Sequence, residues 1–142
     1  MKTVFADSLY WIAIVRPNDS WKHAAKRAKS LLHNVRILTT DEVLTEFLAA
    51  LSGGGQNLRR QASQMVRAIL DDPNVTVRPQ SRDSFLQGVE LYEQRLDKEY
   101  SLTDCISMNA MKSESVTEVL TKDQHFAQEE FNVLITKEHE ST

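Results

Sequence analysis

Short apolar segments with the composition of buried strands alternate along this chain with longer segments of helical periodicity. This alternation predicts an α/β domain with a mostly parallel sheet, because parallel strands need a long crossover, usually a helix, between them. We expect the strands at residues 3–6, 36–38, 75–77, 116–120 and 132–135.

The segments between these strands carry helix signals. The apolar run 9–15 does not reveal its period, and we interpret it as a buried helix that ends before Pro17. Thr39, followed three residues later by Glu42, forms a capping-box pattern that predicts another helix, which the triple glycine at 53–55 ends. A further short helix is expected over 102–111. Three more helices are predicted from apolar residues that share one helical face: Trp21, Ala24, Ala25, Ala28, Leu31, Leu32 and Val35; Leu58, Ala62, Met65, Val66 and Ile69; and Phe85, Val89, Tyr92 and Leu96.

The size and composition fit one globular domain. The chain has 142 residues, of which 41% are hydrophobic and 26% are charged, enough to bury one core. We expect a domain over residues 1–136 and a polar tail over 137–142. A single cysteine, Cys105, excludes an internal disulfide, and the run 9–15 is too short to cross a membrane. With no signal-peptide pattern, these features predict a cytoplasmic protein with no membrane contact.

The charge balance limits how the protein could meet nucleic acid. A net charge of −3 argues against binding through bulk positive charge, but it allows an enzyme that contacts a phosphodiester through a metal ion and a few cations. Arg59, Arg60 and Arg67 form a basic side of one predicted helix. This side is either a solvated face or a contact surface for RNA phosphates or a protein partner.

Four acidic residues stand near the ends of predicted strands or the starts of helices. Asp7 follows the first strand, Asp104 begins a helix and Asp123 follows the fourth strand, while Glu46 lies one turn inside its helix. The carboxyl ends of parallel strands form the crevice in which α/β proteins bind ligands. Carboxylates gathered there would repel one another unless protons or a divalent cation supplied positive charge.

Each acid also has a structural interpretation. Asp104 completes a capping box with Ser101, Asp7 could cap the following helix, Asp123 could be a turn residue, and Glu46 could lie on a solvated face. The coincidence of position along one edge of the sheet favours a shared site over four separate explanations.

Other candidate motifs are weaker. Cys105 lies among apolar residues, so we interpret it as a buried small side chain and not as a nucleophile. The four histidines, at 23, 33, 125 and 139, have no spacing typical of a zinc site. The triple glycine lacks the Gly-Lys-Ser/Thr ending of a phosphate-binding loop.

Over residues 2–135 the chain resembles the PIN domains of bacterial VapC toxins. The resemblance rests on the segments Val-Phe-Ala-Asp-Ser at 4–8, Thr-Thr-Asp-Glu-Val-Leu-Thr-Glu-Phe at 39–47, Leu-Thr-Asp-Cys-Ile-Ser-Met at 102–108 and Leu-Thr-Lys-Asp-Gln-His-Phe at 120–126. Asp7, Glu46, Asp104 and Asp123 match the four acidic positions of that family, and Ser8 and Thr121 match its neighbouring hydroxyl residues. Two positions depart from the pattern or compete with it: Leu9 stands where the family often has a small polar residue, and Glu42 rivals Glu46 for the second acid.

The resemblance implies a PIN-like fold, a three-layer α/β/α sandwich with a mostly parallel central sheet of about five strands. It also implies Mg²⁺- or Mn²⁺-dependent endoribonuclease activity, with Asp7, Asp104 and Asp123 as metal ligands, Glu46 as the fourth catalytic acid, and hydroxyls at 8 and 121 orienting these groups. The expected biological role is the toxin of a type II toxin-antitoxin pair, with a separately encoded antitoxin, an RNA substrate and a homodimeric state.

Two other functions stay open. One is a non-catalytic PIN-like module that binds RNA or protein, since a fold alone does not determine function. The other is a phosphotransfer domain of the receiver or dehalogenase type, which we rank last because Asp7-Ser8-Leu9 lacks the Asp-x-Asp form.

Overall fold

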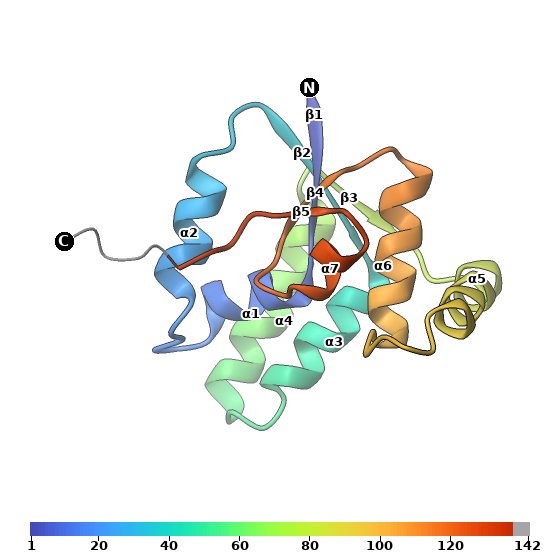
Figure 1. Cartoon of the computed structure of the whole chain (residues 1–142). Helices are drawn as coiled ribbons and strands as arrows, with labels where there is room; N and C mark the ends of the chain where they lie inside the picture. Colours follow the sequence, from blue (N-terminus) through green and yellow to red (C-terminus); the bar gives the residue numbers. More distant parts are fainter. Residues whose placement is uncertain (138–142) are drawn as a thin grey trace.

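The central sheet of the computed structural model has five strands, all parallel, and the structure describes residues 1–137. The strands are β1 (Lys2–Ala6), β2 (Val35–Thr40), β3 (Val75–Arg78), β4 (Glu118–Leu120) and β5 (Asn132–Val133). Their spatial order is β3-β2-β1-β4-β5, so β1 lies at the centre, where Phe5 pairs with Leu38 on one side and with Val119 on the other. The chain therefore moves outward from β1 to β3 and then returns past β1 to β4 and β5 (Figure 1).

Helices cover both faces of this sheet. They are α1 (Ser8–Val15), α2 (Lys22–Ser30), α3 (Asp41–Leu51), α4 (Gln56–Asp71), α5 (Arg82–Gln94), α6 (Leu102–Ser113) and α7 (His125–Gln128). Crossovers between parallel strands are right-handed, so reversing the direction of strand addition after β3 moves the connecting helices to the other face. Figure 1 shows α2 and α6 on opposite sides of the strands. The predicted three-layer α/β/α sandwich is confirmed.

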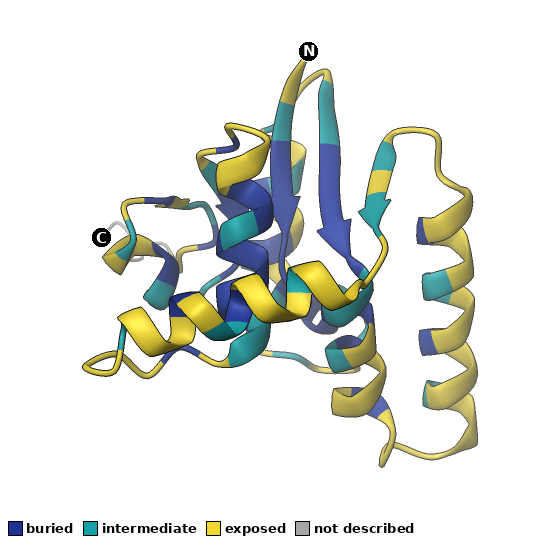
Figure 2. Ribbon diagram, turned by 90° about the vertical axis from the view of Figure 1, so that its right-hand side faces the viewer, coloured by how far each residue is buried: buried dark blue, intermediate teal, exposed yellow. Residues whose placement is uncertain are grey.

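The core lies on the central strands. The side chains of Phe5, Leu38 and Val119 are fully buried, and so are Phe47 of α3 and Phe126 of α7. Figure 2 shows the carboxyl-terminal halves of β1 and β2 in dark blue, the colour of buried residues. Strands covered by helices on both faces need such continuous apolar segments, which explains why they were recognisable in the sequence.

Several predicted boundaries are wrong. Val35 begins β2 instead of ending a helix, because α2 stops at Ser30 and the backbone reverses at Asn34 with a φ of +54°. The fourth and fifth strands are shorter than predicted, spanning only Glu118–Leu120 and Asn132–Val133. Helix α5 also ends at Gln94, before the predicted apolar position 96.

The cap of α3 is displaced by one residue from its prediction. Thr40, not Thr39, is the N-cap, and its hydroxyl accepts a hydrogen bond of 3.1 Å from the Val43 backbone N–H. Thr39 is still in β2, where its hydroxyl donates to the carbonyl of Ala6 at 2.9 Å. This bond joins the carboxyl ends of the two central strands and so helps to fix the position of the next residue, Asp7.

Two expectations about the whole chain remain. The domain expected over 1–136 and the tail over 137–142 stay predictions, and residues 138–142 lie outside the described part of the chain. Among the described helices, none combines the length and apolar character that crossing a membrane requires.

Candidate active site

The predicted acidic residues gather at the carboxyl ends of β1 and β4, where the strand order reverses. Asp7 directly follows β1, and its backbone N–H donates to the carbonyl of Leu120 at the end of β4, at 3.2 Å. Thr121 and Asp123 come next along the chain after β4. Open α/β sheets bind their ligands at such a switch point, because the connections on its two sides diverge and leave a crevice.

Asp7 is the most buried member of this cluster, with 2% of its surface exposed. Its Oδ2 accepts a hydrogen bond of 2.8 Å from the hydroxyl of Thr121, while its Oδ1 is buried without a hydrogen-bond partner. Although Asp7 is the N-cap residue of α1, its side chain makes no capping bond, so the capping explanation is wrong. Burial raises the pKa of Asp7 to about 7, against the opposing effect of the Thr121 bond and with the help of the charges of Asp104 and Glu46.

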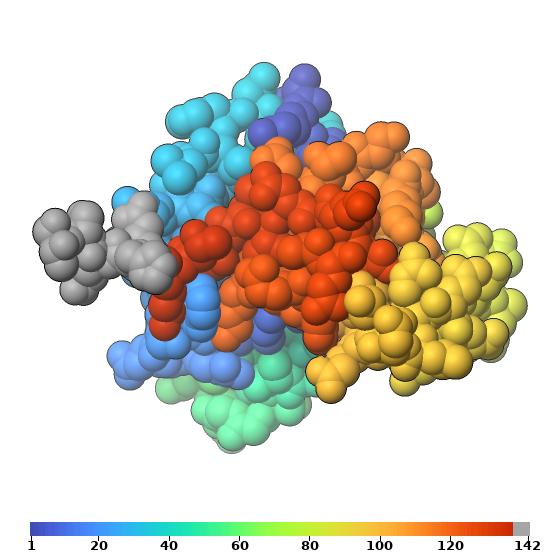
Figure 3. All heavy atoms as spheres, viewed as in Figure 1, coloured from blue at the N-terminus to red at the C-terminus, as the bar shows by residue number. Residues whose placement is uncertain are grey.

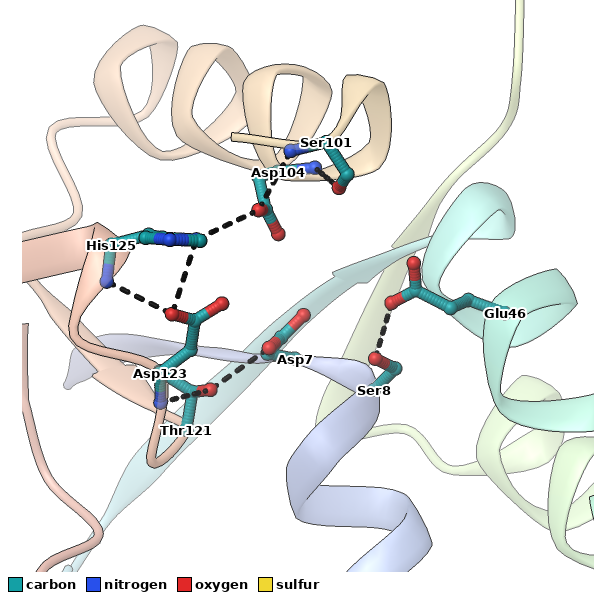
Figure 4. Close-up of polar contacts among 8 residues, drawn as sticks. All are labelled: Asp7, Ser8, Glu46, Ser101, Asp104, Thr121, Asp123 and His125. Carbon is teal, nitrogen blue, oxygen red and sulfur yellow. Dashed lines mark hydrogen bonds and ion pairs between the residues drawn. The ribbon is translucent and has the colours of Figure 1, made fainter. Parts of the chain in front are cut away.

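Asp104 both caps a helix and faces the cluster. Its Oδ2 accepts a bond of 3.0 Å from the Ser101 backbone N–H, and its own N–H donates to the Ser101 hydroxyl at 3.0 Å, completing the predicted capping box of α6. Burial raises the pKa of this carboxyl despite these bonds, and the charge of Asp123 raises it further. The two interpretations of Asp104 are therefore compatible, because the cap fixes the carboxylate toward the other acids (Figure 4).

Asp123 lies in the turn between β4 and α7. Its backbone N–H donates to the Thr121 hydroxyl at 3.1 Å, and its Oδ1 accepts a bond of 2.9 Å from the backbone N–H of His125. These local bonds confirm that it is a turn residue. They also direct its carboxylate toward Asp7 and Asp104 (Figure 4).

Glu46 reaches the cluster from α3, on the opposite side from Asp123 (Figure 4). Its Oε1 accepts a short hydrogen bond from the hydroxyl of Ser8. Burial raises the pKa of Glu46 against this bond, and the charges of Asp104 and Asp123 contribute. Each predicted hydroxyl thus supports a different acid: Ser8 contacts Glu46, and Thr121 contacts Asp7.

The sequence analysis missed His125. Its Nδ1 lies 3.3 Å from Asp123 Oδ1 and 3.5 Å from Asp104 Oδ2, and it is buried without a hydrogen bond of acceptable geometry. Zinc spacing relates histidines to one another and not to acids, so it does not indicate His125. Its position two residues after Asp123, in the turn that follows a strand, was the available signal.

The donor set suits a hard divalent cation. Asp104, Asp123 and His125 each offer one ligand atom, and these atoms all lie within 4.8 Å of one another. The unpartnered Oδ1 of Asp7 is a further oxygen without a proton donor. Mg²⁺ and Mn²⁺ favour carboxylate oxygens, so the residues present fit such an ion.

Other candidate residues lie apart from the cluster. Arg59, Arg60 and Arg67 are exposed on α4, which packs against α3 and the edge strand β3. Arg59 donates to the carbonyl of Ser52 and Arg60 to the side chain of Asn57, both at 3.0 Å. The structure thus places the three arginines on a helix at the β3 edge, whereas the acids gather at β1 and β4.

Cys105 lies in the first turn of α6 and is fully buried. Burial raises the pKa of its thiol to about 11, so it stays protonated at neutral pH. The structural interpretation of this cysteine is confirmed.

Comparison with known protein families and sequences identifies the family of this chain. The PIN domain family matches residues 4–131 of this chain. The chain belongs to the PIN domain family. No curated protein sequence matches it.

Solved structures of related fold include one described as a toxin. Mycobacterium tuberculosis VapC20, described as a sarcin-ricin loop cleaving toxin, is 23% identical, with a TM-score of 0.80 over 90% of this PIN domain chain and 95% of that one. The structure of FitAB bound to an IR36 DNA fragment gives 17% identity and a TM-score of 0.67 over 97% of this chain and 99% of that one. The structure of FitAcB from Neisseria gonorrhoeae gives 14% identity and a TM-score of 0.63 over 92% of this chain and 96% of that one. These likenesses confirm the PIN fold that the resemblance implied.

Proposed function

We propose that this PIN domain is a metal-dependent endoribonuclease that hydrolyses RNA phosphodiester bonds. The observation that carries the proposal is the convergence of four carboxylates, those of Asp7, Glu46, Asp104 and Asp123, at the switch point of the sheet (Figure 4). They come from four separate elements of the fold. Burial and neighbouring charges raise the pKa values of Asp7, Glu46 and Asp104, and this unfavourable arrangement points to a function that needs it.

The acids have distinct proposed roles. Asp7, Asp104 and Asp123 would hold Mg²⁺ or Mn²⁺, and Glu46 would complete the shell, partly through water. When bound, such an ion offsets the charge of a phosphate and lowers the pKa of a water molecule, which provides the hydroxide for hydrolysis. Thr121 fixes the carboxylate plane of Asp7 by its hydrogen bond of 2.8 Å.

The comparisons support RNA as substrate and an antitoxin as partner. VapC20, which has the same fold, is described as cleaving the sarcin-ricin loop. A second structure of related fold is that of FitAB bound to a DNA fragment. We propose by analogy that this chain is the cytoplasmic toxin of a type II pair, inhibited by a separately encoded antitoxin and assembled as a homodimer.

The alternative is a non-catalytic PIN-like module that binds RNA or protein. The electrostatics disfavour it. Burial keeps the pKa of Asp7 at about 7, so holding this carboxyl ionised in the folded protein costs free energy at neutral pH. A scaffold would gain nothing from that cost, whereas a cation-binding site needs the ionised group.

The test is incubation of the purified protein with a mixed RNA pool, with and without Mn²⁺, followed by mapping of the new ends. The nuclease proposal predicts Mn²⁺-dependent ends at defined positions, and their loss in the Asp104→Asn variant purified in parallel. The binding-module alternative predicts retained RNA with no new ends. Ends that persist unchanged in the Asp104→Asn protein would show that the cleavage does not depend on the proposed site, which would contradict the proposal.

A further inference from the structure

We propose that His125 supplies a nitrogen ligand to the metal site and makes it selective for first-row transition ions such as Mn²⁺ over Mg²⁺. The inference rests on the proposed function only in that both require a divalent cation at the carboxylates. It adds a nitrogen ligand to the carboxylate oxygens, which changes the ion that the site prefers.

The first step is geometric. Two atoms bound to one ion at about 2.1 Å lie about 3 Å apart when they are at a right angle and about 4.2 Å apart when they are opposite. The Nδ1 of His125 lies 3.3 Å from Asp123 Oδ1 and 3.5 Å from Asp104 Oδ2. Both separations lie between these two values, as expected for ligands of one ion.

The second step is the state of the nitrogen. His125 Nδ1 is buried, and its contacts with the two carboxylates are longer than an ordinary N–H···O hydrogen bond. A cation between the nitrogen and the two carboxylates would contact all three ligand atoms at once. The unpartnered Oδ1 of Asp7, whose residue is 98% buried, is an independent observation at the same place (Figure 4).

The third step is the orientation of the ring. The imidazole packs against the ring of Tyr100, with centroids 5.6 Å apart, and the backbone N–H of His125 is fixed by Asp123 at 2.9 Å. Arg95, just after α5, forms a short ion pair with Glu129, just after α7. Figure 3 shows the loop between α5 and α6, in yellow, lying against the segment after β4, in red. The contact with Tyr100 and the backbone bond position the ring without an ion, and the ion pair joins the two segments that carry these residues.

The fourth step is chemical. Mg²⁺ strongly favours oxygen ligands and keeps several waters, so an imidazole adds little to its binding. Transition ions accept imidazole nitrogen readily, and their affinities for sites with nitrogen ligands exceed those of Mg²⁺. A site with three carboxylates and one imidazole therefore favours Mn²⁺ over Mg²⁺ more than a site with carboxylates alone.

The experiment measures the ion directly. Pulsed electron paramagnetic resonance on the full-length protein with Mn²⁺ detects a nitrogen nucleus bound to the ion, and titrations with Mn²⁺ and with Mg²⁺ give the two affinities. We expect the nitrogen signal in the native protein and its loss in His125→Gln, together with a decrease of about tenfold in the ratio of Mn²⁺ to Mg²⁺ affinity. His23→Gln, which changes an exposed histidine on α2, is the matched control and keeps both properties.

The outcomes separate the two proposals. Bound Mn²⁺ without a nitrogen signal overturns the role of His125 and leaves the metal-dependent nuclease intact. A nitrogen signal in a protein that cleaves no RNA supports the role of His125 and contradicts the nuclease. Failure to bind Mn²⁺ at all contradicts both. Because His125→Phe retains an aromatic ring beside Tyr100, it repeats the test in a variant chosen to preserve packing.

Discussion

The hydroxyl of Thr121 donates a hydrogen bond of 2.8 Å to Oδ2 of Asp7, although 114 positions separate the two residues in the chain. The bond joins the ends of the two strands on either side of the switch point. It also lowers the pKa of Asp7, in opposition to burial. The same hydroxyl accepts from the backbone N–H of Asp123, so one side chain positions two of the four acids.

Replacing Thr121 with valine keeps the shape of the side chain and removes both bonds. We expect the free energy of unfolding to fall by about 1–3 kcal/mol at pH 8, because a buried carboxylate loses its donor. Urea denaturation measures this change. Thr45→Val is the control, since the Thr45 hydroxyl donates to a carbonyl within its own exposed helix turn, and it should cost less than about 0.5 kcal/mol. Equal losses in the two variants would show that the contact with Asp7 has no special weight.

Replacing Asp104 with asparagine separates its two roles. The amide oxygen can still accept the bond from Ser101, so we expect α6 to stay capped and the melting temperature to change by only a few degrees. The lost charge should lower RNA cleavage by about 100-fold or more, equivalent to about 2.7 kcal/mol of transition-state stabilisation. Asp97→Asn, on the exposed loop before α6, is the matched control. Cleavage at the native rate by Asp104→Asn would remove this residue from the catalytic set.

The metal-free protein should lose stability as the pH rises from about 4 to about 7. Burial raises the pKa of Asp7 from 3.8 in the unfolded chain to about 7 in the folded protein, so the folded state binds more protons in this window. With each pKa unit worth about 1.4 kcal/mol, the total loss is of the order of 4 kcal/mol. Chemical denaturation at a series of pH values in EDTA measures it. Asp7→Asn should flatten the profile, and an unchanged slope in that variant would contradict the assignment.

A bound divalent ion should reverse that loss. Mn²⁺ at about 100 times its dissociation constant should stabilise the native state by about 2.7 kcal/mol, because the unfolded chain does not hold the site together. The increase in melting temperature should be larger at pH 8 than at pH 5.5, since protons compete for Asp7 below its pKa of about 7. EDTA should reverse the effect, and Asp7→Asn should reduce it. The absence of any shift across a titration, with Ca²⁺ compared in parallel, would argue against a preformed site.

The arginines of α4 give a separate test of an RNA contact. If Arg59 and Arg60 bind phosphates, the double glutamine variant should reduce the slope of log affinity against log salt by about 1.4, at about 0.7 for each contact with a single strand. Binding is measured in the Asp104→Asn background, so that the RNA stays intact. The pair Lys26→Gln and Lys29→Gln on α2 removes the same charge and should leave the slope closer to native. Identical slopes in the two double variants would assign the arginines to solvation or to a protein partner.

Much of the fold was predictable because its signals are local. The apolar segments of β1 and β2 and the capping box at Ser101 and Asp104 depend on residues within one turn or one strand. The errors occurred where local signals compete. Val35 fits an apolar helical face, but the left-handed backbone at Asn34 ends that segment first. Thr39 and Thr40 are both capping residues by type and both pair with β3, and only the hydrogen bond from the Val43 N–H to the Thr40 hydroxyl shows which of them caps α3.

Local patterns in the sequence were enough to predict an alternating α/β chain and to single out four acids near strand ends and helix starts as candidate site residues. Tertiary structure alone decided how they combine. It paired Ser8 with Glu46 and Thr121 with Asp7, gave Asp104 a place in the cluster as well as a cap, and brought the nitrogen of His125 between two carboxylates. The reason is that strand order and helix packing set these distances, and contacts between residues 38 or 114 positions apart leave no local pattern in the chain.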